Sequence, residues 1–156
     1  MEVAMILSSK DRYGIIAMFD LAVQQGERPV PLVELSQKHN ISVSYLEQLF
    51  AQLRRAGLVK SRRGPTGGYF LGRDPSDITI NDVVKAIRYG EESFSEFPRG
   101  DAASEGLKLW ENFSHRMHRM LDEISLSDVL RSIETGQIVH YPSAARAHGD
   151  KSAKLN

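Results

Sequence analysis

The residues with the clearest chemical potential lie in the stretch KSRRGPTGGYFLG, from Lys60 to Gly72. Lys60, Arg62 and Arg63 place three cations within four positions, beside several glycines and a proline. Such a loop can hold the phosphates of a nucleotide, or it can form a hairpin tip that lies against DNA. A nucleotide-binding P-loop follows a strand, opens a helix and contains Gly-Lys-Ser or Gly-Lys-Thr. This stretch lacks that triplet and joins two predicted strands, so we favour the hairpin.

The same region concentrates positive charge on a chain whose formal net charge is zero. Residues 54–63 contain no acidic residue. Their basic residues, called the basic run from here on, are Arg54, Arg55, Lys60, Arg62 and Arg63. A local basic patch on a neutral chain indicates a polyanionic partner such as double-stranded DNA, although a solvated face of the fold would carry the same charges.

Other kinds of site are poorly supported. The 156 residues include no cysteine, which excludes disulfides and thiolate-bound metal and is compatible with a cytoplasmic protein. No apolar run approaches the roughly 18 residues of a membrane span, and we see no signal peptide. Glu111, His115 and His118 could bind a divalent metal, but a solvated helix face explains them more simply. No nucleophile–base pair or cofactor fingerprint indicates an enzyme.

The elements that position these residues are mainly helices. Apolar residues at helical spacing predict a first helix from Ser8 or Ser9 to about Gln25. Pro31 suits the first turn of a short second helix that ends at His39. The tight break that follows leads directly into a third helix, so these two helices are expected to be close neighbours.

The third helix is expected to begin at Ser42 or Ser44 and to end at Gly57. Ser44 and Glu47 have the spacing of a capping box, in which each side chain bonds the other residue's backbone. The following segments LVKSR and GYFLGR, joined by RGPTGG, predict two short strands in a hairpin.

After the hairpin we expect a helix from Thr79 to Arg88, an irregular segment, a long helix from Ser104 to about Ile124, and a short last helix. Apolar residues of the long helix step by three or four positions, a stripe that suits a partner helix but could equally pack on the protein's own core. The residues of this predicted dimer interface are Leu107, Trp110, Phe113, Met117, Met120, Leu121 and Ile124.

Two helices joined by a tight turn and followed by a hairpin have the chain order of a winged helix-turn-helix. The predicted fold class is therefore mainly α with a small β-hairpin, plus a long C-terminal dimerisation helix. Gln48 can pair with adenine and Glu47 can accept from a cytosine amino group, although capping alone could explain Ser44 and Glu47. Arg63, beside the glycines, could enter a minor groove. The predicted DNA-binding residues are Ser42, Ser44, Tyr45, Glu47, Gln48, Arg54, Arg55, Lys60, Arg62, Arg63, Gly64, Gly67 and Gly68.

The segment SVSYLEQLFAQLRRAGLVKSRRGPTGGYFLGRDPSDITINDVVKAI, with SSKDRYG near the start, closely resembles the IscR/NsrR/CymR family of bacterial winged-helix transcription regulators. The resemblance runs from about Met5 to Leu130. It implies a homodimer formed through the long helix, with each protomer placing a recognition helix and a wing on half of a palindromic operator. The positions that match the family's recognition-helix contacts are Ser44, Tyr45, Glu47 and Gln48, and the position that matches its wing arginine is Arg63.

The iron–sulfur members of this family carry three cysteines in the loop before the long helix, and the IscR type adds a histidine early in that helix. Counting back from Trp110, Ser104 stands where the last cysteine would be and Leu107 where the histidine would be. Serine and leucine cannot replace thiolate and imidazole as cluster ligands. We therefore expect no cofactor, and a signal carried by a regulatory protein or a small molecule, as in the CymR type. Two explanations stay open: another signal, or cysteines replaced by serine at Ser93, Ser95 and Ser104.

The predicted organisation has a DNA-binding domain at 1–89, a sensor or linker loop at 90–103, dimerisation helices at 104–135 and a flexible tail at 136–156. We expect a sequence-specific transcription regulator, a repressor, that receives its signal at the loop. The alternative is a protein-interaction module that binds a metabolic enzyme, with DNA binding secondary. The intact basic run argues against that alternative.

Overall fold

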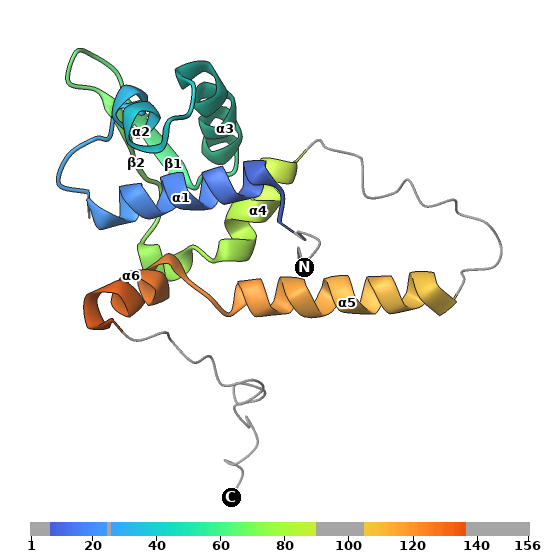
Figure 1. The fold of residues 1–156 in the computed structure, drawn as a ribbon. Coiled ribbons are helices and arrows are strands. Elements are labelled where there is room, and N and C mark those ends of the chain that lie inside the picture. Colours follow the sequence, from blue (N-terminus) through green and yellow to red (C-terminus); the bar gives the residue numbers. More distant parts are fainter. Residues whose placement is uncertain (1–6, 25, 90–104, 137–156) are drawn as a thin grey trace, which may run out of the picture.

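The computed structural model describes residues 7–24, 26–89 and 105–136, apart from the side chain of Leu107. Helices dominate, and they accompany an antiparallel β-hairpin (Figure 1). The elements are α1 (Ser9–Val23), α2 (Leu32–His39), α3 (Val43–Arg55), β1 (Val59–Arg62), β2 (Gly68–Leu71), the 3₁₀ turn η1 (Pro75–Asp77), α4 (Ile80–Arg88), α5 (Glu105–Asp122) and α6 (Leu126–Thr135). The predicted mainly helical winged helix-turn-helix is confirmed. None of the described helices is long and apolar enough to cross a membrane.

The first helix starts at a capping box. The Ser8 hydroxyl accepts a hydrogen bond from the Asp11 amide at 3.2 Å, and the Asp11 carboxylate accepts one from the Ser8 amide at 2.7 Å. This reciprocal pair satisfies two backbone donors that a helix start otherwise leaves free. α1 ends at Val23, slightly before the end expected from the sequence.

The turn of the helix-turn-helix is set by Asn40, which adopts a left-handed conformation with φ of 54°. Asparagine visits this conformation more readily than most residues. α3 then begins after Ser42, whose hydroxyl accepts from the Tyr45 amide at 3.2 Å. The predicted capping box of Ser44 and Glu47 is wrong, because Ser42 supplies the cap and both residues already lie within α3.

The hairpin that forms the wing is tied to the base of α2. β1 and β2 pair in antiparallel register with Arg62 opposite Gly68. Tyr69 also exchanges two hydrogen bonds of 2.9 Å with Val30, just before α2. The wing is thereby held at a fixed position relative to the helix-turn-helix.

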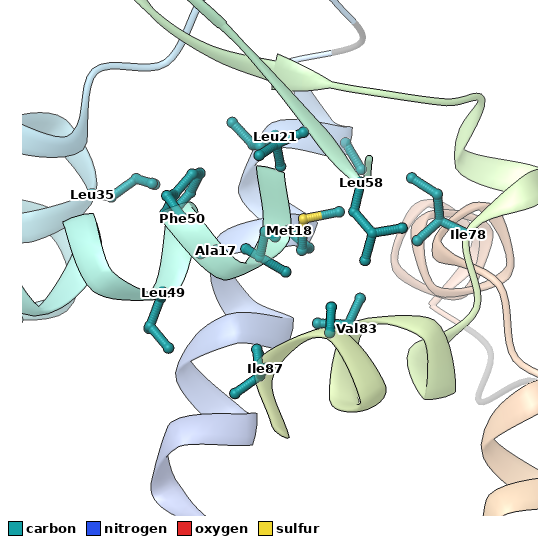
Figure 2. Close-up of a cluster of buried hydrophobic side chains, with 14 of the residues drawn as sticks. Ala17, Met18, Leu21, Leu35, Leu49, Phe50, Leu58, Ile78, Val83 and Ile87 are labelled. Carbon is teal, nitrogen blue, oxygen red and sulfur yellow. The ribbon is translucent and has the colours of Figure 1, made fainter. Parts of the chain in front are cut away.

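The core of residues 7–89, called the head from here on, gathers around α1. Figure 2 shows Met18 of α1 among Phe50 of α3, Leu58 and the α4 residues Val83 and Ile87. All five side chains are at most 1% exposed. Because these contacts join α1, α3 and α4, apolar burial sets the orientation of α3 and of the surface it presents to solvent.

The long helix α5 lies along one side of the head and extends beyond it (Figure 1). The chain then returns to the head at α6. Leu126 is fully buried, and its amide donates to the Ile78 carbonyl at 2.9 Å. The Ile80 amide donates to the Ile124 carbonyl at the same distance. The end of α5 and the start of α6 therefore join the core of the head.

A buried polar contact reinforces this junction. Asn81 of α4 is fully buried and donates to the Asp122 carboxylate of α5 at 2.7 Å. Its carbonyl oxygen lies 2.8 Å from Nδ1 of His118, also on α5. Both ends of the Asn81 carboxamide are satisfied, as a buried polar group requires.

Candidate nucleic-acid interface

The outward face of α3 presents a continuous polar and basic surface. Its exposed positions follow the spacing of one helix face, and its apolar positions lie on the opposite, buried face. The exposed residues are Ser44, Glu47, Gln48, Ala51, Arg54 and Arg55, and the buried ones are Leu46, Leu49, Phe50 and Leu53. Since Ser42 caps the helix, the side chains of Ser44 and Glu47 are not used for capping. The predicted reading residues Glu47 and Gln48 face solvent.

The amino end of α3 has the chemistry of a phosphate contact. The hydroxyls of Ser42 and Ser44 lie 3.5 Å apart, and both residues are exposed. Free backbone amides and the positive end of the helix dipole add to the attraction for an anion. This end of α3 therefore suits a DNA backbone phosphate.

Tyr45 is in a different environment from its polar neighbours. It is half-buried, and its ring meets that of Tyr13 of α1 edge-on, with centroids 6.0 Å apart. Arg12 in turn places its guanidinium carbon 5.3 Å from the Tyr13 ring centre. Packing thus accounts for part of the role of Tyr45. Sequence reasoning missed Tyr13 and Arg12, because nothing local indicates that α1 meets the start of α3.

The basic run lies on the surface and is electrostatically unsatisfied. All of its members are exposed. Arg54 approaches the Ser61 hydroxyl at 3.5 Å, which links the end of α3 to β1. Across the described part of the chain, no member of the run forms an ion pair with a carboxylate, whereas Arg28 pairs with Glu34 and Arg88 with Asp11. Cations without carboxylate partners are available to phosphates.

The wing glycines have separate explanations. A Cβ on Gly67 would lie 2.3 Å from the Arg62 carbonyl oxygen, and one on Gly68 would lie 2.6 Å from the Val30 backbone. The fold alone requires glycine at both positions. Gly64 has φ of 116° and open space where a Cβ would be, so its conformation needs glycine but its surroundings would not clash. Of the three glycines, Gly64 is the one beside which the tip of the wing has open space for a DNA backbone.

The apolar stripe of α5 divides into two parts. Trp110, Phe113 and Met120 are exposed, and the first two rings lie 5.9 Å apart. Met117 is half-buried, and Leu121 and Ile124 pack against the core of the head. Leu109, which sequence reasoning missed, is 73% exposed. The Leu107 side chain lies outside the description.

The α5 residues weighed as a divalent-metal site, Glu111, His115 and His118, lie in different environments. His118 is engaged with Asn81, and His115 and Glu111 are exposed. No group of three or more potential metal ligands occurs among the residues that the structure describes. The three loop serines considered as replaced cysteines, Ser93, Ser95 and Ser104, lie outside those residues.

Known proteins match most of this chain. A sequence model of the Rrf2 family, described as an iron-dependent transcriptional regulator, matches residues 7–132. The HTH-type transcriptional regulator IscR of Vibrio atlanticus is 40% identical over 139 residues, which cover 86% of this chain and 80% of that protein. The protein of the same name from Photorhabdus laumondii is 39% identical over 156 residues, which cover 97% of this chain and 92% of its own.

Solved structures agree in fold. IscR of T. potens superposes with a TM-score of 0.73 at 38% identity, covering 90% of this chain and 97% of that one. CymR of B. subtilis, described as the global cysteine regulator, superposes with a TM-score of 0.67 at 36% identity, covering 81% and 97%. Both the helical head and the hairpin are therefore shared with transcription regulators.

Proposed function

The chain belongs to the Rrf2 family of transcriptional regulators, and we propose that it reads DNA with the outward face of α3 and with the wing. It is a DNA-binding regulator and not an enzyme. The observation that carries the assignment of these surfaces is their continuity. Exposed polar residues of α3 lead directly into a basic run that has no carboxylate partner among the described residues.

Within this surface each group has a distinct proposed task. Ser42 and Ser44 contact a backbone phosphate, and Glu47 and Gln48 face base edges in the major groove. Arg62 and Arg63 reach the adjacent backbone or minor groove from the wing. Because most of the affinity then comes from phosphate contacts, binding should weaken steeply as salt rises.

We propose that the protein acts as a homodimer through the exposed part of the α5 stripe. A symmetric dimer presents two copies of α3 and therefore fits a palindromic operator with half-sites about one helical turn apart. A dimer bound at an operator can exclude polymerase, and repression is the proposed outcome. A cytoplasmic location follows from the same proposal, since that is where bacterial DNA lies.

The family description names iron, but a cysteine-ligated cluster does not fit this chain, because it contains no cysteine. We infer that it responds to a partner protein or a small molecule, with 90–103 as the proposed sensing segment. Protein purified without oxygen should be colourless, and its iron content should be far below one atom per chain. A charge-transfer band at visible wavelengths would overturn this inference. The comparisons give no support to the alternative of an enzyme-binding module in which DNA binding is secondary.

The proposed function is tested by selection from fragmented genomic DNA with the purified full chain. Enriched fragments should share one palindromic motif, and a run-off transcription assay should show less transcript from a promoter that contains it. Enrichment without a shared motif would contradict the proposed reading of DNA. An increase in transcript would contradict the proposed repression but not the proposed reading of DNA.

A further inference from the structure

A pocket of about 430 Å³ opens where the carboxyl end of α3 meets α4. Its volume lies within the range of roughly 300–1,000 Å³ that is typical of small-molecule sites. It is lined by Gln52, Arg55, Ala56, Leu58, Arg73, Asp82, Lys85, Ala86 and Tyr89. These residues come from α3, the turn between α3 and β1, the segment after β2, and α4 with the residue that follows it, so the fold and not a single loop builds the pocket.

The charges around the pocket favour an anion. Arg55, Arg73 and Lys85 line it together with the acidic residue Asp82. Arg73 donates to the Ala56 carbonyl at 3.1 Å, which holds its guanidinium at the wall. The Asp82 carboxylate accepts from the Thr79 amide at 3.0 Å as part of the cap of α4, so part of its hydrogen-bonding capacity is already used. The net charge of the lining residues is therefore positive.

Gln52 adds a second requirement. Its Oε1 is buried and has no hydrogen-bond partner. Among the side chains that the structure describes, it is the one buried nitrogen or oxygen atom left without a partner. Buried polar atoms in folded proteins almost always have a partner, and an unmet one is costly. An oxygen acceptor needs an N–H or O–H donor. The lining residues therefore favour an anion that also carries a hydrogen-bond donor.

We propose that this pocket binds a small carboxylate metabolite that bears an amino or hydroxyl group, in other words an amino acid or a hydroxy acid. The carboxylate lies among Arg55, Arg73 and Lys85. On binding, the side chain of Gln52 turns its buried Oε1 towards the pocket, where it accepts from the ligand's donor. A DNA phosphate supplies the charge but no such donor. The pocket is also separate from the proposed phosphate contact at Ser42. That residue lies at the other end of α3, whose 13 residues span about 20 Å at about 1.5 Å each.

The location suggests a regulatory use, which rests on the proposed function. Arg55 belongs to the basic run and also lines the pocket. A bound carboxylate would compete with DNA for its guanidinium and lower operator affinity. Tyr89, which also lines the pocket, directly follows α4 and precedes the proposed sensing segment.

The test is calorimetric titration of the full-length protein, without DNA, with the twenty amino acids, L-malate and citrate. Succinate, which is malate without its hydroxyl, is the matched anion that lacks the donor. At least one amino or hydroxy acid should bind saturably, and at least tenfold more tightly than its counterpart without the donor. Lys85→Gln should weaken that binding at least tenfold, whereas Lys108→Gln on α5 should not. Gln52→Leu should reduce the advantage of the tightest-binding acid over its counterpart without the donor.

Three outcomes would overturn the proposal. They are no saturable binding by any probe at millimolar concentration, equal binding by the wild type of the tightest-binding acid and its counterpart without the donor, or binding that Lys85→Gln does not affect. Thermal unfolding of each variant checks that the fold is retained. Because no DNA is present, failure here leaves the proposed function standing. Conversely, if the protein failed to bind an operator, the proposal that this pocket binds a small carboxylate would still stand.

Discussion

Arg88 at the end of α4 binds Asp11 at the start of α1, across 77 residues of sequence. Its Nη2 lies 2.5 Å from Oδ2 of Asp11, and its Nε lies 3.1 Å from Oδ1. Asp11 is fully buried and also caps α1 through Ser8. The pair fixes the point at which the chain leaves α4 for the proposed sensing segment. Burial alone raises the pKa of Asp11, but the hydrogen bonds from Arg88 and Ser8 outweigh it, and the pKa lies below its ordinary value.

Replacing Asp11 with Asn should destabilise the head. The exchange removes the carboxylate that pairs with the mostly buried Arg88 side chain, and breaking a buried ion pair in this way costs about 3–5 kcal/mol at pH 7. Urea unfolding followed by circular dichroism measures the loss. Asp74→Asn is the matched control, because Asp74 is exposed, and its unfolding midpoint should hardly move.

The same pair predicts a pH dependence. The folded-state pKa of Asp11 is lowered, so its stabilisation is fully present above the unfolded pKa, about 3.9, and is lost as pH falls through the folded value. Wild-type protein should therefore lose more stability than Asp11→Asn as pH falls below about 3.9, the unfolded pKa. Parallel curves for the two proteins would show that Asp11 does not carry this dependence.

Asn81 should control how firmly α5 docks on the head. Asn81→Ala leaves Asp122 and His118 without their buried partner, and a cost of about 1–3 kcal/mol is expected. Hydrogen exchange should accelerate in the carboxyl half of α5. Asn112→Ala changes an exposed asparagine on the same helix and should leave exchange unaltered. Unchanged exchange in Asn81→Ala would mean that apolar contacts alone hold α5.

Gly67 should be essential to the shape of the wing. An added Cβ would meet the Arg62 carbonyl oxygen at 2.3 Å, a backbone atom that cannot move without distorting β1. Gly67→Ala should cost about 1–3 kcal/mol and weaken operator binding at least tenfold. Thr66→Ala, at an exposed neighbouring position, should do neither. A Gly67→Ala protein with wild-type affinity would exclude wing geometry as a determinant.

The α5 stripe should set the oligomeric state. Phe113→Glu places a charge on an exposed apolar position, so the protomer should fold normally while the dimer dissociates. Sedimentation equilibrium should report a monomer, and Arg116→Ala on the same helix should stay dimeric. A dimeric Phe113→Glu protein would move the proposed interface elsewhere.

Local patterns predicted most of the elements, because caps, breakers and apolar periodicity act over a few residues. Thr79 caps α4 and the helix ends at Arg88, as the sequence reasoning expected. What sequence alone missed depends on tertiary contact. The choice of Ser42 over Ser44 as cap was open locally, and the Arg88–Asp11 pair joins distant parts of the chain. The contact of Tyr13 with Tyr45 is another such case.

The central claim, that α3 and the wing read DNA by sequence, is tested most directly by fluorescence anisotropy on a selected operator and a scrambled duplex of equal composition. Wild type should prefer the operator by about 10³-fold or more, with affinity that falls steeply as salt rises. Arg63→Ala should bind the operator at least tenfold more weakly, and Arg131→Ala on α6 should match the wild type. Equal affinity for the two duplexes, or an unaffected Arg63→Ala, would contradict the account.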